Sequence, residues 1–499
     1  MPQTGGDRAV VLGGSIAGLL AARVLADTHA EVVVVERDEL SHSAGHRRGV
    51  PQSRHIHGLL ARGQQALEEL FDGVTTELVD LGAPAGDMLQ DLRVCFGGHR
   101  LQPGPSGLLA LQASRPLLEA ALRARVHALP SVTFMDRCDV AGLTTTSDGD
   151  RVTGARVIRR LDGSAEQTVT ADLVVDATGR GSRTPVWLEM LGYSPPPVQR
   201  VRIGLGYASR TYRLVPGLLD GDLGILTAPT PEHPRGGALA AMENDRFLVT
   251  LFGILGDHPP TDPGGFTDFA ATLQFPDIHQ ALRDAEPLDE PVPFRHPASV
   301  RHRYERLSRF PEGLLVIGDA MCTFNPVYGQ GMSVAALQAL ALRTHLQQHT
   351  TAQPVRFFRQ IGRIVDVPWS MATGGDLAFP KVVGRRTLQM RLLNHYLGKV
   401  LAAAAHDPWL GRAFLRVAGL VDPPQALLAP GVTVRVLRAH PRRSSWAPRE
   451  APDNGHRRTA TSSVPTEPGR QRSLPPGAAV PTPDPPHQPS HDTRSESSP

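Results

Sequence analysis

One carboxylate and a run of glycines carry groups that could hold a sugar-like chain beside an anion. Asp319 follows Leu314 to Ile317, an apolar run of strand length. A loop then leads to Gly329, and apolar residues recur with helical period from Met332 onward. The segment is therefore predicted to form a strand, a loop and a helix.

This arrangement suits the chemistry of an anionic reduced flavin. A carboxylate can accept hydrogen bonds from ribityl hydroxyls, and free N–H groups at a helix N-terminus stabilise a negative charge. We therefore expect Asp319 to bind the ribityl chain and the amides from Gly329 to Met332 to face the flavin N1/O2 edge. The structural alternative is a turn whose glycines serve only the chain reversal.

A second glycine pattern lies near the N-terminus. The apolar strand Arg8 to Leu12 leads into Gly13-Gly-Ser-Ile-Ala-Gly18, followed by a helix from Leu19 to Ala26 and a strand from Val32 to Val35. This order is typical of dinucleotide binding, in which the helix N-terminus faces the pyrophosphate. The unit favours a bound FAD or NAD over a purely structural turn.

Single residues of this unit have distinct expected roles. Gly13 turns the chain, Gly18 lets the helix pack on the strand, and Glu36 accepts hydrogen bonds from the adenosine ribose. Ser15 stands where the fingerprint has its second glycine, so it would crowd the pyrophosphate or donate a hydroxyl to it. Arg37 suggests a phosphorylated ribose, but Glu36 beside it argues against a 2′-phosphate.

The loop from residue 45 to residue 58 is rich in Arg, His and Gly, as binding loops on a rigid scaffold often are. Arg47, Arg48, Gln52 and His55 are candidates to line a cofactor or substrate face. A solvated arginine loop is the alternative.

A predicted helix begins after Ser114, a favourable N-cap residue. Arg115 lies in its first turn, where a positive side chain opposes the helix dipole. A bound phosphate or flavin would explain this arginine, and a surface ion pair is the competing explanation.

Metal and disulfide chemistry have little support. His55 and His57 lie two residues apart, a spacing that can bind a metal ion from a strand, yet no third ligand lies nearby. The cysteines Cys95, Cys138 and Cys322 lack metal-ligand spacing, and their number is odd. We therefore expect no metal site, and the cysteines fit a reducing cytoplasm.

The elements that must position these residues are of two kinds. A small ribbon is expected from Val140 to Thr146 against Val152 to Arg159, and Ala171 to Ser182 repeats the theme of strand, acid and glycine turn. The longer alternating runs Gly204 to Arg213 and Gly237 to Gly253 indicate an antiparallel sheet inserted into the first domain.

The chain is therefore predicted to be α/β, with a Rossmann-like FAD-binding domain, an inserted mainly antiparallel β-sheet substrate domain, C-terminal helices and a disordered tail. The expected parts are the FAD-binding domain over residues 1–195 and 297–380, the substrate sheet over 196–296, the C-terminal helices over 381–440, including 385–405 and 409–421, and the tail over 441–499. The tail is rich in proline, serine and arginine and has a single aromatic residue, Trp446, a composition that cannot bury a core.

Overall composition excludes several classes of function. The formal net charge is only +3, which gives no reason to expect nucleic acid or an anionic membrane as a partner. No apolar run approaches the roughly 18 residues of a membrane span. We expect a cytoplasmic protein without a membrane span, acting on a small organic molecule.

Three motifs stand in a specific order along residues 8 to 430: Gly13-Gly-Ser-Ile-Ala-Gly18, Asp176-Ala-Thr-Gly179 and Gly318-Asp-Ala…Asn325-Pro-Val-Tyr-Gly-Gln-Gly331. Together they resemble the class A FAD-dependent monooxygenases, the para-hydroxybenzoate hydroxylase fold. Within this family, the Arg47 to His57 loop, the Thr178 to Ser182 turn and the late loop are most similar to bacterial polyether epoxidases, near squalene epoxidase, and to unassigned tailoring oxygenases.

The resemblance implies an enzyme of secondary metabolism that inserts one oxygen atom from O₂ into an organic substrate through a flavin C4a-hydroperoxide, by epoxidation of an alkene or by hydroxylation. It implies reduction of FAD by NAD(P)H, with a separate flavin reductase as the alternative electron source. No catalytic side chain is assigned, because the flavin does the chemistry. The expected cofactor-binding residues, from the patterns and the resemblance together, are Gly13, Ser15, Gly18, Glu36, Arg37, Arg48, Arg115, Asp319, Pro326, Gly329, Gln330, Gly331 and Met332.

The sequence also departs from the family pattern. Ser15 replaces a family glycine, and Asp176-Ala-Thr-Gly179 is not the Asp-Gly pair that some hydroxylases use for both FAD and NADPH. Direct use of NADPH and a separate reductase therefore stay open. No acid–base pair stands out for deprotonating a phenol, which favours alkene epoxidation.

Other functions share this architecture. An FAD-dependent ene-reductase of the geranylgeranyl reductase type would deliver hydride to a double bond. A flavin halogenase would carry a Trp-x-Trp-x-Ile-Pro stretch, which the sequence lacks. A structural FAD-binding protein is the non-enzymatic alternative. The patterns do not identify the substrate, the oligomeric state or the role of the tail.

Overall fold

The computed structural model describes residues 6–40, 44–349 and 351–439, so the predicted disordered tail lies outside the described residues. Its first sheet has five strands in the order β17-β11-β1-β2-β7, and every pairing is parallel. The strands are β1 (Arg8–Leu12), β2 (Glu31–Val35), β7 (Val132–Met135), β11 (Leu173–Asp176) and β17 (Leu314–Val316). Their nearly continuous Val and Leu runs are buried on both faces, as in other parallel sheets.

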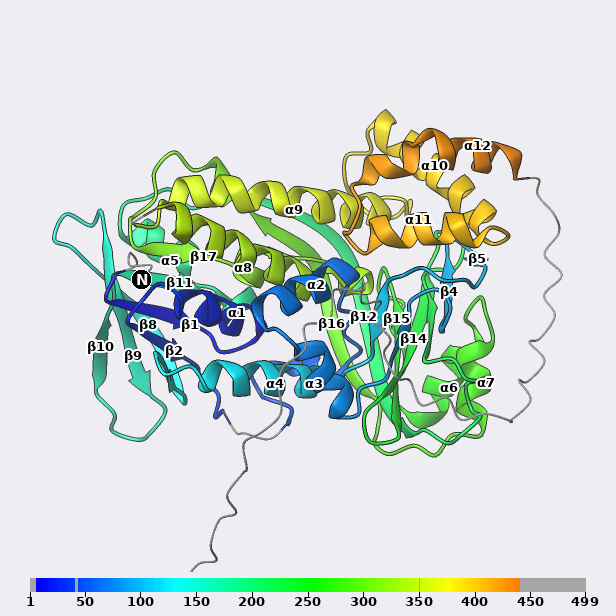
Figure 1. The fold of residues 1–499 in the computed structure, drawn as a ribbon, viewed down its shortest axis with the longest axis horizontal. Coiled ribbons are helices and arrows are strands. Elements are labelled where there is room, and N and C mark those ends of the chain that lie inside the picture. The colour runs from blue at the N-terminus through cyan, green and yellow to red at the C-terminus, as the bar shows by residue number, and fades with distance from the viewer. Residues whose placement is uncertain (1–5, 41–43, 350, 440–499) are drawn as a thin grey trace, which may run out of the picture. The chain divides into compact units, whose positions relative to one another are not determined.

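Helices cover this sheet and complete its core. Helix α1 contacts both α4 and α8, and α9 lies along α8 (Figure 1). The helices are α1 (Ile16–Leu25), α2 (Ala61–Leu70), α3 (Val74–Asp80), α4 (Arg115–His127), α5 (Thr184–Met190), α8 (Gln330–Gln348) and α9 (Pro354–Asp376). Ser114 caps α4 as predicted, because its side chain accepts a hydrogen bond from the Leu117 amide. The predicted Rossmann-like α/β domain is therefore confirmed.

A smaller antiparallel sheet lies beside the first one. The predicted ribbon is present as β8 (Cys138–Thr145) and β9 (Val152–Arg159), and a third strand, β10 (Glu166–Thr170), pairs with β9. Strands β3 (Ala85–Asp87) and β6 (Leu109–Leu111) form a separate pair.

The third large element is an eight-stranded sheet in the order β18-β16-β12-β15-β14-β13-β4-β5. Its strands are β4 (Leu92–Phe96), β5 (His99–Arg100), β12 (Val198–Arg213), β13 (Gly224–Thr227), β14 (Arg235–Met242), β15 (Arg246–Gly253), β16 (Val292–His302) and β18 (Cys322–Thr323). All pairings are antiparallel except β13 with β4. The predicted substrate sheet is thus joined by strands from before residue 196 and after residue 296.

The two faces of this sheet pack differently. One face forms a core with α6 (Pro263–Ala271) and α7 (Asp277–Arg283), which includes Phe247, Val249 and Leu251 of β15. The opposite face carries Tyr207 and Phe252, which pack with Leu377 and Phe379. Because side chains alternate along each strand, one face of the sheet packs against α6 and α7 and the other carries Tyr207 and Phe252.

Helices close the described part of the chain. They are α10 (Leu388–Ala404), α11 (Pro408–Ala418) and α12 (Pro430–Arg438), close to the predicted helices. Their buried residues form a separate core with Leu89, Val94 and Leu101. Among the described residues, no helix is long and apolar enough to cross a bilayer, and no cluster of side chains could hold a metal ion.

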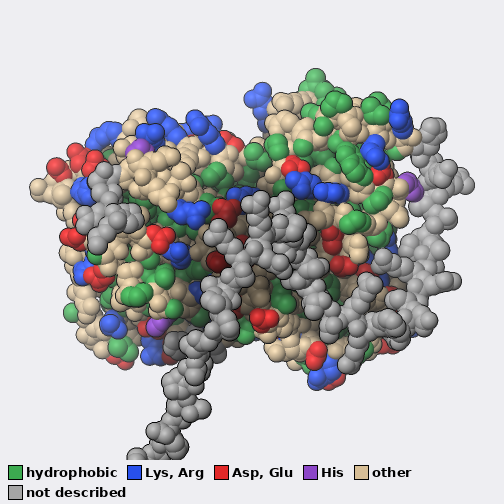
Figure 2. Space-filling view, viewed as in Figure 1, with side chains coloured by type: hydrophobic (Ala, Val, Ile, Leu, Met, Phe, Trp, Pro, Cys, Tyr) green, Lys and Arg blue, Asp and Glu red, His purple; other side chains and the backbone are tan. Residues whose placement is uncertain are grey.

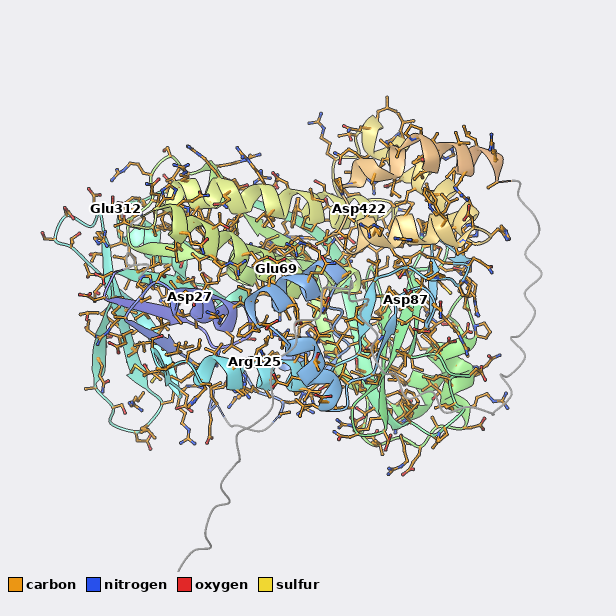
Figure 3. The ribbon with its side chains drawn as sticks, viewed as in Figure 1. Asp27, Glu69, Asp87, Arg125, Glu312 and Asp422 are labelled. Atoms are coloured by element: carbon orange, nitrogen blue, oxygen red, sulfur yellow. The ribbon has the colours of Figure 1, made fainter. Side chains whose placement is uncertain are left out.

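The surface mixes positive and negative side chains with apolar ones on the face shown in Figure 2. Several ion pairs join neighbouring helices. Figure 3 labels Arg125 of α4, whose Nε lies 2.5 Å from Glu77 of α3, and Glu69 of α2, whose Oε2 lies 3.6 Å from Arg343 of α8. Pairs this exposed contribute at most about 1 kcal/mol each, so the buried cores hold the fold together.

Candidate functional site

Gly13, in the turn after β1, and Gly18, in the first turn of α1, leave no room for a side chain. Gly13 has φ of +101°, and a Cβ there would lie 2.6 Å from the Ala177 carbonyl oxygen. A Cβ on Gly18 would overlap the Gly13 carbonyl oxygen. The helix therefore begins directly against the turn, and its first amides are left without partners inside the helix.

Glu36, at the end of β2, holds the same turn. Its Oε2 accepts a hydrogen bond from the Gly14 amide at 2.7 Å, and its Oε1 accepts one from the Asp38 amide at 3.0 Å. Arg37 is exposed beside it. The structure thus places Glu36 against the glycine turn, and its role in binding a ribose stays a prediction.

A buried ionic cluster lies beside the N-cap residue of α1, Ser15. Ser15 Oγ donates to Glu119 Oε2 at 2.9 Å and accepts from Arg115 Nη2 at 2.9 Å. Arg47 Nε donates to Glu119 Oε1 at 2.8 Å, and Arg47 Nη1 lies 3.3 Å from Glu36. Serine in place of the family glycine therefore binds protein groups from α4.

The structure brings Arg47 into this cluster, whereas Arg48 is exposed and lies outside it. Sequence patterns could not separate the two neighbours, because both are arginines of the same polar loop. Glu119 was also missed, since an acid within a helix reads as an ordinary solvated residue. Burial lowers the pKa of Arg123, the next basic group along α4, although Glu119 opposes that effect.

Asp319 lies where two parallel strands end side by side. It follows β17, and a Cβ on Gly179, after β11, would lie 3.9 Å from the Asp319 Cβ. A Cβ on Gly331 would lie 3.8 Å from Asp319 Oδ1, so the carboxylate faces the start of α8. Burial raises the pKa of Asp319 above its ordinary value, while the guanidinium groups of Arg180 and Arg115 oppose this rise.

No side chain caps the N-terminus of α8 among the described residues. Gly329 is its N-cap, with φ of +65°, a conformation that favours glycine. The Gln330 side chain is buried, and its Oε1 has no hydrogen-bond partner among the described residues. Pro326 begins a short 3₁₀ turn, η5 (Pro326–Tyr328), before the helix, and Met332 is buried in the first turn of α8.

A buried acid that sequence analysis missed supports this loop. Asp376 Oδ1, at the C-terminus of α9, accepts hydrogen bonds from Asn325 Nδ2 at 2.8 Å and from the Tyr328 hydroxyl at 3.1 Å. Burial raises the pKa of Asp376 to about 6, although both hydrogen bonds oppose the rise. The loop that precedes α8 is therefore fixed by the last residue of a different helix.

The middle motif has a different role. Asp176 is fully buried, and its two oxygens accept hydrogen bonds from the Thr178 amide and from the hydroxyls of Thr178, Ser182 and Thr184, at 2.5–2.9 Å. Each of the two Asp176 oxygens therefore accepts two hydrogen bonds from groups of the same turn. The carboxylate therefore stabilises the chain reversal that carries Arg180.

The substrate sheet faces these groups. The guanidinium of Arg180 lies 5.1 Å from the centre of the Phe294 ring, and the Phe294 and Tyr207 rings stack 5.2 Å apart. His55 packs edge-on against Tyr207, with the ring centres 4.7 Å apart. A cavity of about 200 Å³ lies between the polar loop, the start of α4 and this sheet, and His55, Arg115 and Ser209 are among its lining residues.

These features fit FAD. A glycine turn with free helix amides suits the pyrophosphate, and the Asp319 carboxylate suits the ribityl hydroxyls. The Gln330 oxygen and the first amides of α8, which no described side chain caps, suit the polar edge of the flavin ring. The N-terminal glycine turn therefore suits the ADP part of FAD, and the segment from Asp319 to Met332 suits its flavin part.

Comparisons with known proteins agree with this assignment. The FAD binding domain family matches residues 8–356. Protein Rv3254 of Mycobacterium tuberculosis is 36% identical over 83% of this chain and 90% of its own length. Kynurenine 3-monooxygenase of Salinispora tropica is 29% identical over 69% of this chain and 73% of its own length.

Solved structures share the fold at much lower identity. The flavin-dependent brominase Bmp2 matches with a TM-score of 0.59 and 14% identity, over 83% of this chain and 94% of its own. Identity this low supports a common architecture and leaves the reaction open.

Proposed function

This chain belongs to the family of class A FAD-dependent monooxygenases that share the FAD binding domain, and we propose that it oxygenates a small organic molecule at an electron-rich carbon. It is a flavin-dependent oxidoreductase. The finer parts of the proposal are the substrate, the choice between epoxidation and hydroxylation, and the source of electrons.

One observation carries the proposal. Asp319 lies beside Gly331 at the N-terminus of α8, so a carboxylate and a set of free amides lie at the same edge of the parallel sheet. The carboxylate can accept hydrogen bonds from the ribityl chain, and the amides can donate to a negative flavin edge. This pairing suits a flavin that becomes anionic when it is reduced.

Bound FAD would supply the redox chemistry and activate O₂. The protein's part is to hold the flavin and to shield the reacting atoms. Asp319 would accept hydrogen bonds from the ribityl chain, and the first amides of α8 would donate to the flavin ring and stabilise its negative charge. Tyr207, Phe252 and Phe294 of the substrate sheet, with Leu377 and Phe379, form an apolar wall that excludes water.

The middle motif limits how a nicotinamide nucleotide could be held. Because the oxygens of Asp176 are bound within its own turn, they are not available to a second nucleotide. We propose that NAD(P)H or a separate flavin reductase delivers electrons without a dedicated contact to Asp176. A role in secondary metabolism remains part of the proposal, and the genes that flank this one would test it.

The test is the absorbance spectrum of the purified protein, followed by anaerobic reduction and mixing with O₂ in a stopped-flow instrument. We expect a flavin spectrum and a transient that differs from both reduced and oxidised flavin. Bound flavin with no transient, together with anaerobic turnover of an alkene, would indicate the ene-reductase of the geranylgeranyl reductase type. Absence of flavin would contradict the proposal.

A further inference from the structure

The C-terminal helices expose apolar side chains more than any other part of the described chain. Of the five most exposed large apolar side chains among the described residues, four belong to these helices or to the loop before α10: Val383, Leu388, Leu392 and Leu437. Leu388 is 73% exposed and Leu392 is 62% exposed, and they stand four residues apart on one side of α10. An apolar patch of this kind marks a contact with something outside the fold.

The same side of α10 carries positive charge. Arg391 lies beside Leu388 and Leu392 at helical spacing, and Lys399 follows two turns after Leu392. Both basic side chains are exposed, and the described part of the chain gives neither of them an ion-pair partner. Their charges are therefore available to a ligand.

The sequence around α10 lacks acids. Between Asp376 and Asp407 there are five Lys or Arg and no Asp or Glu, and both lysines of the chain, Lys381 and Lys399, lie in this stretch. The net charge of the whole chain conceals this concentration, because acids elsewhere offset it. Net charge is therefore no guide to the partners of this surface.

The loop before α10 is fixed to the molecule. The Arg386 guanidinium donates to the carbonyl oxygens of Leu377, Phe379 and Val382 at 2.9, 2.8 and 2.6 Å. The Val382 side chain is buried in the apolar cluster on the substrate sheet, whereas that of Val383 is 84% exposed. The hydrogen-bonded backbone thus holds Val383 out into solvent.

This combination of side chains suits the surface of a lipid bilayer. Figure 2 shows apolar and positive side chains together on the lobe where α10 to α12 lie. Leucine side chains can enter the boundary between headgroups and acyl chains, while the long stems of Lys and Arg let their charges reach lipid phosphates. Protein interfaces are enriched in aromatic residues, but the exposed large apolar residues of α10 and its loop are Val and Leu.

We propose that a docking surface formed by Val383, Leu388, Arg391, Leu392 and Lys399 binds bilayers that contain anionic phospholipids. The apolar side chains insert at the interface, and the two basic side chains contact phosphate groups. No helix of the described residues could cross a bilayer, so the contact is peripheral. The inference goes beyond the proposed oxygenase function, because neither flavin nor substrate takes part in it.

The test is co-sedimentation of the purified full chain with vesicles. We expect binding to vesicles made of equal parts of phosphatidylcholine and phosphatidylglycerol, and weaker binding when salt is added, because salt screens the charges. Vesicles of phosphatidylcholine alone should bind little protein. Absence of binding to the mixed vesicles, or equal binding to both kinds, would refute the proposal.

The double variant L388S/L392S tests the apolar part. We expect its affinity for the mixed vesicles to fall by about tenfold or more. V186S/M190S is the matched control, because Val186 and Met190 are also exposed and four residues apart on a helix, α5. The control should bind as the wild type does, and an equal affinity of the two double variants would contradict the assignment to α10.

R391Q tests the charged part, with an expected loss of about fivefold in affinity for the mixed vesicles. Its control is R283Q on α7, since Arg283 is exposed and has no ion-pair partner within the described ranges. All four variants should keep the wild-type melting temperature, because each replaced side chain is exposed. The proposal fails if R391Q and R283Q bind alike, or if gel filtration shows a dimer that L388S/L392S converts to a monomer, since a second copy would then cover this surface.

Discussion

The nucleotide-binding end and the substrate sheet assemble their functional groups in different ways. At the nucleotide end, the key groups are close in sequence, as with Gly13 and Gly18 in one turn, or Asp319 and Gly331 in one strand, loop and helix. On the sheet, His55, Ser209 and Thr250 come from a loop and two strands that are widely separated along the chain.

This difference has a physical origin. A dinucleotide needs free helix amides and close backbone approach, which a short glycine pattern supplies wherever the chain makes the turn. A substrate pocket needs side chains brought together by register, and register is a property of the whole sheet. The dinucleotide site therefore depends on single residues such as the turn glycines. The substrate pocket depends on pairs of residues that face each other across the sheet.

The largest effect is expected from G18A at the nucleotide end. The added methyl group would overlap the Gly13 carbonyl oxygen, so the helix or the turn must move. We expect a loss of roughly 2–4 kcal/mol in the free energy of unfolding and protein purified with little flavin. Thermal unfolding and the ratio of flavin to protein absorbance measure both.

Gly398 gives the matched control for that variant. It lies within α10, is exposed, and a Cβ there would meet no neighbour within 4 Å. G398A should therefore stabilise the protein by about 0.5–1 kcal/mol. If G18A and G398A had the same stability and flavin content, the backbone around Gly13 could move to accept the methyl group. The nucleotide-binding end would then depend on single residues less than we infer.

The next effect is expected from D319N. The amide keeps the size of the side chain but loses the charge that strengthens hydrogen bonds from the ribityl hydroxyls, a loss of about 1.5–3 kcal/mol. We expect flavin affinity to fall by roughly 10- to 100-fold, measured by fluorescence titration of the apoprotein at pH 8.

E312Q provides the control for the charge change. Glu312, labelled in Figure 3, is 69% exposed and pairs with Arg151 at the surface. Its substitution should leave flavin affinity unchanged. A similar loss in both variants would point to overall charge and against a direct contact at Asp319.

The sequence predicted the nucleotide end well because its signals are local. The strand Arg8–Leu12, the glycine turn, the cap Ser114 and the segment around Asp319 were all predicted where the structure has them. Contacts between distant segments were harder to predict. Arg47 and Arg48 are neighbours in the polar loop, and Arg47 enters the buried cluster through Glu36 of the glycine unit and Glu119 of the distant helix α4.

The polar contacts on the substrate sheet show the same boundary. The pairing of Ser209 with Thr250 arises from the register of β12 with β15. His55 joins that pair through tertiary contact, so no spacing in the sequence could have indicated it.

The smallest effect is expected from D376N, which tests a contact between distant segments. Burial raises the pKa of Asp376 from 3.8 to about 6. The folded protein therefore holds this proton more tightly than the unfolded chain does, and the stability that the protonated acid contributes is lost as the pH rises from about 4 through 6.

Asparagine removes this titration and can still accept hydrogen bonds from Asn325 and Tyr328. The free energy of unfolding of D376N, relative to the wild type, should therefore rise by about 2 kcal/mol between pH 4 and pH 7, since a tenfold change in proton affinity is worth about 1.4 kcal/mol. D80N, at the exposed end of α3, should show no such trend. If D376N and D80N show the same pH dependence in urea unfolding across this range, the Asp376 carboxyl is not buried under its loop. The loop before α8 would then be held by its own residues, without support from α9.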